Sequence, residues 1–310
     1  MYKDKKISFV IPCYKSASTI GFVVEKIYEA FPIAEFNIEI VLVNDGSGDD
    51  TFQAIKKLAE DHAEITAINL GKNMGQDAAL MCGYNYATGD YIVSLDDDGQ
   101  NPPIEAHKLL EKIEEGYDAV FGSFMERKYG VFKNLSHRMN DWMARVFVGK
   151  PRNIDLSSYF VMNRYLVDEV IKYKGNYPYV WGLMLRASVN VADIKIEHQE
   201  RMEGGSTYTF GKLLGAWING FLGFSVKPLR LATILGIATA MLGFILLVIV
   251  IISRIIHPDE VEGWTSLVSI IAILGGAQLI TVGVVGEYVG RIFSISSNSP
   301  QYSVHDVIKR

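Results

Sequence analysis

The sequence predicts an α/β domain with a mostly parallel sheet, followed by two transmembrane helices. In the N-terminal part of the chain, short aliphatic runs alternate with segments whose apolar residues recur at helical spacing, an order typical of parallel α/β sheets. Further along, residues 231–252 and 264–286 contain no charged side chain. Each of these segments, of about 22 residues, would extend roughly 33 Å as a helix, enough to cross a hydrocarbon core of about 30 Å.

The predicted strands are short runs of aliphatic and aromatic residues that end at turn-forming residues. We expect them at 7–12, 38–43, 65–70, 91–95 and 119–123. Apolar residues on one helical face predict a helix at 19–31, a further helix follows Asp50 and Thr51 and runs to Leu58, and a third is expected at 76–88. We expect Gly89 to be the C-cap of the helix at 76–88, because glycine readily adopts the left-handed backbone of that position.

Three carboxylates follow the apolar run at 91–95. If the strand pleat continues through them, Asp96 and Asp98 point to one side and Asp97 to the other. Two carboxylates on one side, together with the amide oxygen of Gln100, form a hard oxygen site suited to Mg²⁺ or Mn²⁺. Mg²⁺ is usually held by one or two carboxylates plus substrate phosphates, so the cluster predicts a nucleotide-diphosphate substrate.

A solvated acidic turn is the alternative interpretation of this cluster. Pro12 and Tyr14 follow the first predicted strand, however, and Asp45 follows the second. Ligands of open α/β sheets bind outside the carboxyl ends of the strands, where all these residues would meet. This convergence favours a nucleotide site.

The charges around the two apolar segments predict their orientation. Basic residues precede the first segment and follow the second: Lys227, Arg230, Arg291, Lys309 and Arg310. The connecting loop holds Arg254 and three acidic residues, so the positive-inside rule places both ends of the hairpin, and the N-terminal domain, in the cytoplasm. The net charge of −5 and the absence of a basic stripe argue against a nucleic-acid partner.

Several motifs resemble those of family 2 glycosyltransferases with the GT-A fold, in the branch that uses polyprenyl phosphates. The matching segments are residues 8–14, 43–47 with Asp49, 73–76, 87–90, 96–103 and 224–229. Dolichol-phosphate-mannose synthases and bacterial undecaprenyl-phosphate sugar transferases belong to this branch. The resemblance extends over nearly the whole chain, and its most specific part is the aspartate cluster followed by Gln-Asn-Pro-Pro.

The resemblance implies roles for individual residues. The implied nucleotide-binding residues are Pro12, Tyr14, Asp45, Asp96 and Asp97. The implied ligands of Mg²⁺ or Mn²⁺ are Asp96, Asp98 and Gln100. Asp155 is the best match to a later acidic residue near the acceptor, and it would act in catalysis together with Asp98.

The sequence departs from the family pattern at three places. The usual Tyr-Asn-Glu is replaced by Tyr14 followed by Lys15 and Ser16, and the usual Leu after the last aspartate is Gly99. The common Ser-Lys-Tyr becomes Ser-Thr-Tyr at residues 206–208. One phosphate-binding cation is therefore either missing or supplied elsewhere.

Two amphipathic segments, 132–146 and 210–221, predict helices at the membrane interface. The candidate contacts for the acceptor phosphate are Arg127, Arg138, Arg201 and Ser206. The expected organisation is a cytoplasmic catalytic domain at 1–208, an interfacial helix and linker at 209–228, a transmembrane hairpin at 229–290 and a cytoplasmic tail at 291–310.

Together these features predict an inverting glycosyltransferase at the cytoplasmic face of the plasma membrane. Its expected partners are a nucleotide-sugar donor, with a UDP-sugar favoured, polyprenyl phosphate, and the lipid bilayer; assembly into a homo-oligomer is compatible with the sequence. One alternative is a processive polysaccharide synthase, but the string at 199–202 does not match the Gln-x-x-Arg-Trp motif of that class. The other is a membrane-tethered sugar-nucleotide-binding protein without catalysis, which the intact carboxylate cluster argues against.

Overall fold

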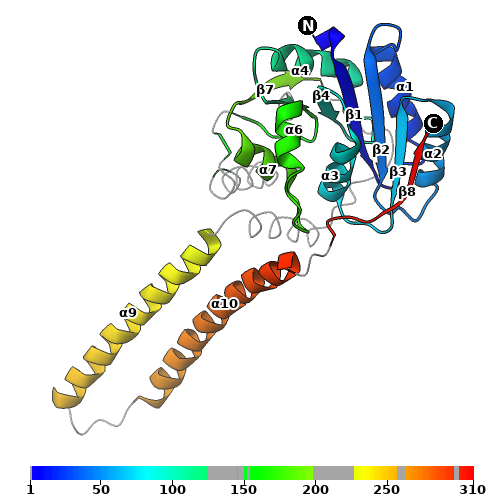
Figure 1. Cartoon of the computed structure of the whole chain (residues 1–310). Coiled ribbons are helices and arrows are strands. Elements are labelled where there is room, and N and C mark those ends of the chain that lie inside the picture. The colour runs from blue at the N-terminus through cyan, green and yellow to red at the C-terminus, as the bar shows by residue number, and fades with distance from the viewer. Residues whose placement is uncertain are drawn as a thin grey trace. The chain divides into compact units, whose positions relative to one another are not determined.

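The structure is a computed structural model that describes residues 2–124, 145, 150–151, 154–197, 227–256, 263–296 and 300–310. The chain forms two compact units (Figure 1). The first comprises Met1–Gly220 together with Pro300–Arg310, and the second comprises Phe221–Ser299. The amphipathic segments at 132–146 and 210–221 lie outside the described residues, apart from Arg145.

The first unit is built on an eight-stranded mixed sheet with the order β7-β5-β6-β4-β1-β2-β3-β8. The strands are β1 (Lys6–Cys13), β2 (Asn37–Asn44), β3 (Ile65–Leu70), β4 (Tyr91–Ser94), β5 (Ala119–Phe124), β6 (Phe160–Asn163), β7 (Val191–Ile196) and β8 (Val304–Lys309). Strand β1 pairs in parallel with β2 and β4, β2 with β3, and β5 with β7. Strands β6 and β8 run antiparallel to their neighbours.

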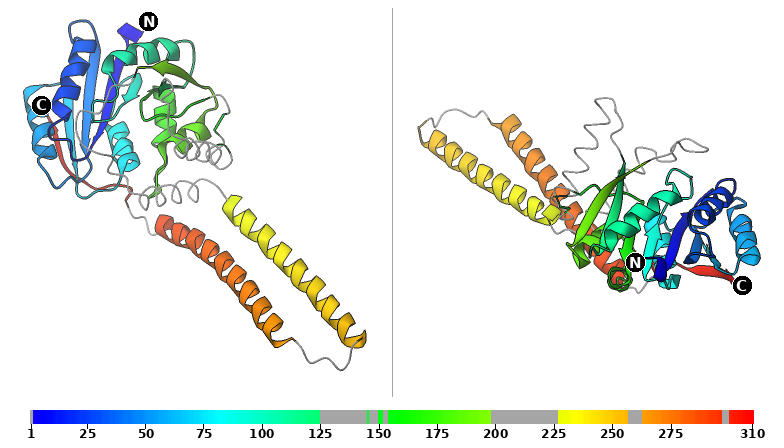
Figure 2. Two further views of the ribbon diagram at one scale, coloured as in Figure 1. Left: turned by 180° about the vertical axis from the view of Figure 1, so that it is seen from behind. Right: turned by 90° about the horizontal axis from the view of Figure 1, so that it is seen from above.

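Helices cover both faces of this sheet (Figures 1 and 2). One face carries α1 (Ile20–Ala30), α2 (Thr51–Asp61) and α4 (Ala106–Ile113), and the other carries α3 (Gln76–Tyr86), α6 (Arg164–Val170) and α7 (Val180–Ala187). Two short 3-10 helices, η1 (Tyr2–Asp4) and η2 (Pro103–Glu105), complete the unit. Because β1 and β2 are buried on both faces, their sequences are almost continuously apolar.

The five predicted strands are present at nearly the predicted positions, and the predicted α/β class is confirmed. The predicted C-cap at Gly89 is wrong, because α3 ends at Tyr86 with Ala87 as its cap residue. Glycine is needed at position 89 for a different reason. A Cβ there would lie 2.5 Å from Ser8 Oγ and 2.8 Å from the Lys6 carbonyl oxygen. The Gly89 N–H donates to Ser8 Oγ at 2.8 Å, which fixes the turn into β4 against the start of β1.

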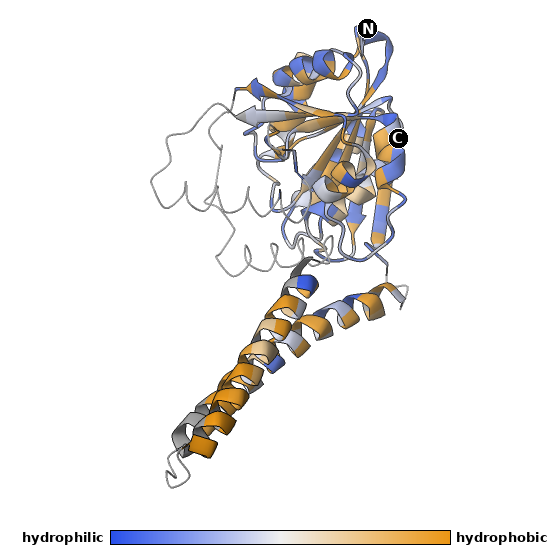
Figure 3. Cartoon of the chain, turned by 90° about the vertical axis from the view of Figure 1, so that its left-hand side faces the viewer, coloured by the Kyte–Doolittle hydropathy of each residue, from blue (hydrophilic) through white to orange (hydrophobic). Residues whose placement is uncertain are grey.

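The second unit contains two long helices, α9 (Lys227–Ile256) and α10 (Trp264–Ser296). Figure 3 shows that both are predominantly hydrophobic along their lengths. Large apolar side chains such as Phe244 and Leu279 are 67% and 73% exposed. The windows Ala232–Ile249 and Ile273–Phe293 are long and apolar enough to cross a membrane.

The sequence did not predict β8, which follows the second unit and returns to the sheet of the first. It pairs antiparallel with β3, and the Gly71 N–H donates to the Ser303 carbonyl at 2.9 Å. The Asn69 side chain also donates to Asp306 Oδ2 at 3.2 Å. The segment expected to be a tail therefore contributes an edge strand to the sheet of the first unit.

Candidate active site

The ends of three parallel strands bring the predicted site residues to one edge of the sheet. Cys13 at the end of β1 pairs with Asn44 at the end of β2, and β4 ends beside β1 at Ser94. Tyr14, Asp45 and the cluster Asp96–Asp98 come directly after these ends. The convergence predicted from the strand order is therefore present, as the rule for open α/β sheets requires.

Asp97 links the segment after β4 to the segment after β1. Its Oδ2 accepts the Tyr14 backbone N–H at 2.9 Å. Burial raises the pKa of the Asp97 carboxyl to about 6, and the Tyr14 N–H only partly offsets this effect. Tyr14 itself remains 44% exposed.

Asp96 is held by three side chains from different parts of the chain. Its Oδ1 accepts from Gln76 Nε2 at 2.8 Å, and its Oδ2 accepts from Asn101 Nδ2 at 3.2 Å and from the Ser158 hydroxyl. Burial raises the pKa of Asp96, and the charge of Asp98 adds to this increase, while the three donors oppose it. Asp96 therefore ties α3, the 99–104 segment and the segment before β6 together.

The strand pleat does not continue through the cluster. Strand β4 ends at Ser94, and the chain turns at Asp97 and Asp98, where Asp98 Oδ1 accepts the Gln100 backbone N–H at 3.0 Å. Gly99 has φ of +75°, a conformation that strongly favours glycine and accounts for the departure from the family's Leu. The condition for the expected alignment of Asp96 with Asp98, a continued strand pleat, is therefore not met, although the two carboxylates remain close enough to interact electrostatically.

The donor set of this turn fits a divalent cation. Asp96 and Asp98 provide hard carboxylate oxygens whose mutual repulsion a cation would relieve, and Gln100 lies in the same turn. Among the described residues, no group of three or more His, Cys, Asp or Glu side chains is placed to enclose a metal. The remaining ligands would have to be substrate phosphates and water, which is the usual arrangement for Mg²⁺.

Asp45 fixes the loop that precedes α3. Its two carboxylate oxygens accept the backbone N–H groups of Met74 at 2.7 Å and Gly75 at 2.9 Å. Burial raises the pKa of Asp45, and the two N–H groups counteract the increase. Next to it, Gly46 has φ of +58° and packs directly on the backbone of Lys72. Asp45 thus shapes the rim of the site, and its contact with a nucleotide stays a prediction, as does that of the buried Pro12.

Lys15 occupies a left-handed backbone conformation with φ of +57°. Its N–H donates to Ser47 Oγ at 3.0 Å, and its Nζ lies 5.7 Å from the centre of the Tyr14 ring. Asn, which the family usually has here, tolerates this conformation better than Lys does. The departure at Lys15 therefore places both backbone strain and a cation beside the exposed Tyr14.

Asp155 lies between two lysines. Its Oδ1 is 3.7 Å from Lys150 Nζ, and its Oδ2 is 3.5 Å from Lys195 Nζ. Three residues after Asp155, Ser158 contacts Asp96. The predicted phosphate contacts Arg127, Arg138, Arg201 and Ser206 lie outside the described residues.

Sequence reasoning missed several residues that the structure brings to this edge. They are Gln76, Asn101, Ser158, Lys150 and Lys195. Gln76 and Asn101 stand inside the quoted motifs and Ser158 follows Asp155 by three residues, so a search for neutral donors to the aspartates would have found them. The two lysines carry no local signal, because each depends on the fold for its position.

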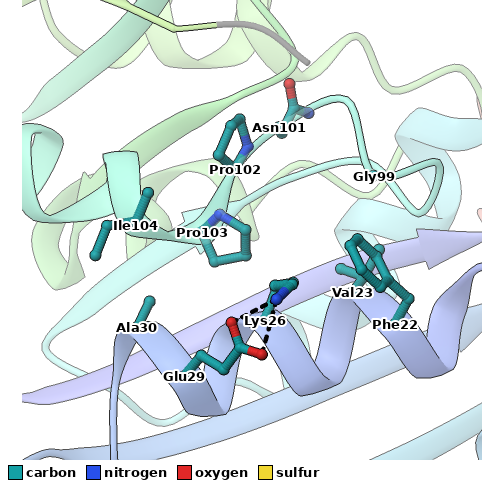
Figure 4. Close-up of a pocket in the computed structure, with 10 residues that line it drawn as sticks. All are labelled: Phe22, Val23, Lys26, Glu29, Ala30, Gly99, Asn101, Pro102, Pro103 and Ile104. Carbon is teal, nitrogen blue, oxygen red and sulfur yellow. Dashed lines mark hydrogen bonds and ion pairs between the residues drawn. The ribbon is translucent and has the colours of Figure 1, made fainter. Parts of the chain in front are cut away.

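A groove of about 340 Å³ lies between α1 and the 99–104 segment (Figure 4). Its walls are mostly apolar and include Phe22, Pro103 and Ile104. Its charged residues, Lys26 and Glu29, are paired with each other at 2.5 Å (Figure 4). Asn101 connects this groove to the site, since its amide reaches Asp96.

Comparison with known proteins assigns the family. Residues 8–171, more than half of the chain, match the model of glycosyl transferase family 2. The chain belongs to this family. Residues 227–292 also match the GtrB C-terminal hairpin, which covers α9 and most of α10.

Curated relatives of this family 2 glycosyltransferase extend over nearly its whole length. The undecaprenyl-phosphate 4-deoxy-4-formamido-L-arabinose transferase of Yersinia enterocolitica serotype O:8 is 30% identical over 309 residues, which cover 99% of this chain and 94% of the relative. The enzyme of the same name from Yersinia pestis bv. Antiqua (strain Angola) is 31% identical over 307 residues, with 98% and 94% covered. The chain is thus a glycosyltransferase, as predicted.

Solved structures show the same fold. Mannosyl-3-phosphoglycerate synthase from Rubrobacter xylanophilus has a TM-score of 0.52 at 20% identity, covering 70% of this chain and 72% of that one. Glucosyl-3-phosphoglycerate synthase from Mycobacterium tuberculosis, in complex with Mn²⁺, uridine diphosphate and phosphoglyceric acid, has a TM-score of 0.51 at 16% identity, covering 70% and 76%. At these identities the likeness concerns the GT-A architecture.

Proposed function

We propose that this glycosyltransferase transfers a sugar from a nucleotide-diphosphate donor, with a UDP-sugar favoured, to a polyprenyl phosphate, with inversion at the anomeric carbon. The observation that carries the proposal is the cluster Asp96–Asp98, held at the carboxyl edge of the sheet in a chain that continues into two apolar helices. The names of the Yersinia relatives support undecaprenyl phosphate as acceptor. The Mn²⁺ and uridine diphosphate bound to the mycobacterial structure support a metal-assisted UDP-sugar donor.

In the proposed reaction, an oxygen of the acceptor phosphate forms a bond to the anomeric carbon. The bond from that carbon to the donor's β-phosphate oxygen breaks, and the nucleoside diphosphate leaves with the electron pair. Asp98, Gln100 and Asp96 would hold Mg²⁺ or Mn²⁺, and a cation bound there would offset the negative charge that develops on the leaving diphosphate. The acceptor phosphate has a second pKa of about 6 and is largely ionised at neutral pH, so it needs little help from a base. Asp155 orients it or accepts a late proton.

We further propose that α9 and α10 cross the plasma membrane as a hairpin, with the catalytic unit in the cytoplasm. Chain connectivity supports this arrangement, because β8 follows the hairpin and belongs to the same sheet as β1–β7. Two crossings return the chain to the side from which it left. Cys13 and Cys82 are buried, so introduced cysteines can report on topology. In intact cells, Gly263→Cys should react with an impermeant thiol reagent and Lys57→Cys should not; the opposite labelling would reverse the orientation.

The activity itself is tested with purified full-length protein in detergent. The protein is incubated with a panel of nucleotide sugars, Mg²⁺ or Mn²⁺, and either undecaprenyl phosphate or undecaprenol. We expect one donor to give a lipid-linked sugar with undecaprenyl phosphate. The same donor should give no product with undecaprenol, because only the phosphate is ionised at neutral pH. Transfer to a growing polysaccharide would favour the processive alternative. Donor binding without turnover would favour the non-catalytic one.

A further inference from the structure

The cluster Lys150, Asp155 and Lys195 is not explained by the metal site. Lys150 has a side chain only 7% exposed, whereas Asp155 and Lys195 are 66% and 54% exposed. A nearly buried lysine ammonium is rare, because removing it from water costs free energy. Here the buried cation faces an open carboxylate that it shares with a second cation. The three groups together carry a net charge of +1.

The fold places this cluster beside the reaction centre. Lys195 lies near the carboxyl end of β7, paired in register with Ser123 of β5, so it stands at the edge where the parallel strands end. Asp155 precedes Ser158 by three residues, which limits the distance between their Cα atoms to about 11 Å even in a fully extended chain. Ser158 itself donates to Asp96. An anion bound by the two lysines would therefore lie near the metal-binding turn, but its ligands would be different residues from those of the metal.

The contacts within the cluster are loose. Distances of 3.5 and 3.7 Å are longer than those of tight charge-assisted hydrogen bonds, which are about 2.7–2.9 Å. An exposed carboxylate at such distances contributes little stability. A phosphate monoester carries about −1.5 to −2 charges and three acceptor oxygens, so it could contact both ammonium groups at once and would attract them more strongly than the single charge of Asp155 does.

We propose that Lys150 and Lys195 bind the phosphate of the acceptor, and that Asp155 holds the two ammonium groups until the acceptor displaces it. This inference rests on the proposed function and names the groups that recognise its acceptor. Once displaced, the Asp155 carboxylate lies next to the bound phosphate, where it can take up a proton.

The test is a comparison of Michaelis constants for the two substrates in full-length protein. Lys195→Met should raise the KM for undecaprenyl phosphate about tenfold or more, the cost of a lost hydrogen bond to a charged group. The KM for the nucleotide sugar should stay within about twofold. Lys150→Met should act in the same direction, and Lys195→Arg should restore most of the acceptor affinity because it retains the charge. Lys172→Met is the matched control, since Lys172 is an exposed lysine paired with Glu169 on α6, and it should change neither constant.

Asp155→Asn separates this mechanism from a structural role. Removing a carboxylate that competes with the phosphate should lower the acceptor KM or leave it unchanged, while kcat falls if the carboxylate also takes the proton. If the cluster were only a structural set of ion pairs, Lys150→Met, Lys195→Met and Asp155→Asn would all change the acceptor KM in the same direction and by a similar amount. The proposal is overturned if Lys195→Met and Lys150→Met both leave the acceptor KM within twofold of wild type, or if Asp155→Asn raises it as much as they do. Should the wild-type protein not use polyprenyl phosphate at all, the proposed function fails first and this inference fails with it.

Discussion

Asp77 provides a pH-dependent test of how the catalytic unit is held together. It lies in the first turn of α3, and its Oδ1 accepts the Val180 N–H at 3.1 Å, at the start of α7. That N–H has no partner within its own helix, so Asp77 caps α7 from a neighbouring element. Burial raises the pKa of the Asp77 carboxyl from 3.8 to about 6, and the Val180 N–H only partly opposes this.

The sign of the effect follows from the raised pKa. Below a pH of about 4, the Asp77 carboxyl is largely protonated in both the folded and the unfolded chain, and its burial does not lower the free energy of unfolding. Between pH 4 and 6 the unfolded chain ionises first, so the folded state loses stability, and above pH 6 the loss is complete. A shift of about 2 pKa units corresponds to about 3 kcal/mol at pH 8, and to about half of that at pH 5.

Asp77→Asn should remove this penalty and keep the bond, since the amide oxygen can still accept the Val180 N–H. We expect the variant to be more stable than wild type by up to about 3 kcal/mol at pH 8, or roughly 6 °C in Tm, with a smaller gain at pH 5. Thermal unfolding followed by circular dichroism at both pH values measures the difference. Asp77→Ala is the control. It loses the hydrogen bond to the Val180 N–H, so its free energy of unfolding should be about 1 kcal/mol lower than that of Asp77→Asn at either pH. A gain from Asn that is equal at pH 5 and pH 8 would refute the reasoning.

Three further predictions concern the rim of the site. Gly46→Ala should cost about 2 kcal/mol or more, because the new Cβ would lie 2.3 Å from the Lys72 carbonyl carbon at a φ of +58°; Gly21→Ala, where nothing lies within 4 Å, should not destabilise, and urea unfolding compares the two. Asp98→Asn should reduce transfer about 100-fold or more with the fold intact by circular dichroism, and full activity in EDTA would remove the metal from the mechanism. Lys15→Asn should stabilise the protein by about 1 kcal/mol, because Asn tolerates a φ of +57°, and an unchanged midpoint of urea unfolding would argue against strain there.

The parallel part of the sheet could be predicted because it is buried on both faces. Strands β1, β2 and β3 are apolar runs between turn residues, and their boundaries followed from composition alone. Strand β6 has four residues, and β8 alternates between half-buried and exposed residues, so neither carries a comparable signal. Gly89 was misinterpreted because a tight approach between two chain segments and a helix cap both select glycine.

The candidate site was predictable to the same extent as the strands that carry it. The meeting of Tyr14, Asp45 and Asp97 followed from the rule that parallel strands end at a common edge. Ser158 could not be placed in this way, because it reaches Asp96 across 62 residues of sequence and comes just before the antiparallel strand β6. Lys195 depends in turn on β7, whose pairing with β5 no local pattern indicates.

Strand β8 follows the two long helices of the second unit in the chain but belongs to the sheet of the first unit. Without β8, strand β3 would be the edge of the sheet and would expose a row of unpaired backbone groups, the situation that leads to edge-to-edge aggregation. Because β8 lies beyond α10 in the chain, the sheet is covered only after the hairpin has been made. In a membrane, β8 can reach β3 only if the helices cross an even number of times. In the membrane arrangement proposed above, the pairing of β3 with β8 would make completion of this sheet dependent on correct insertion of the hairpin.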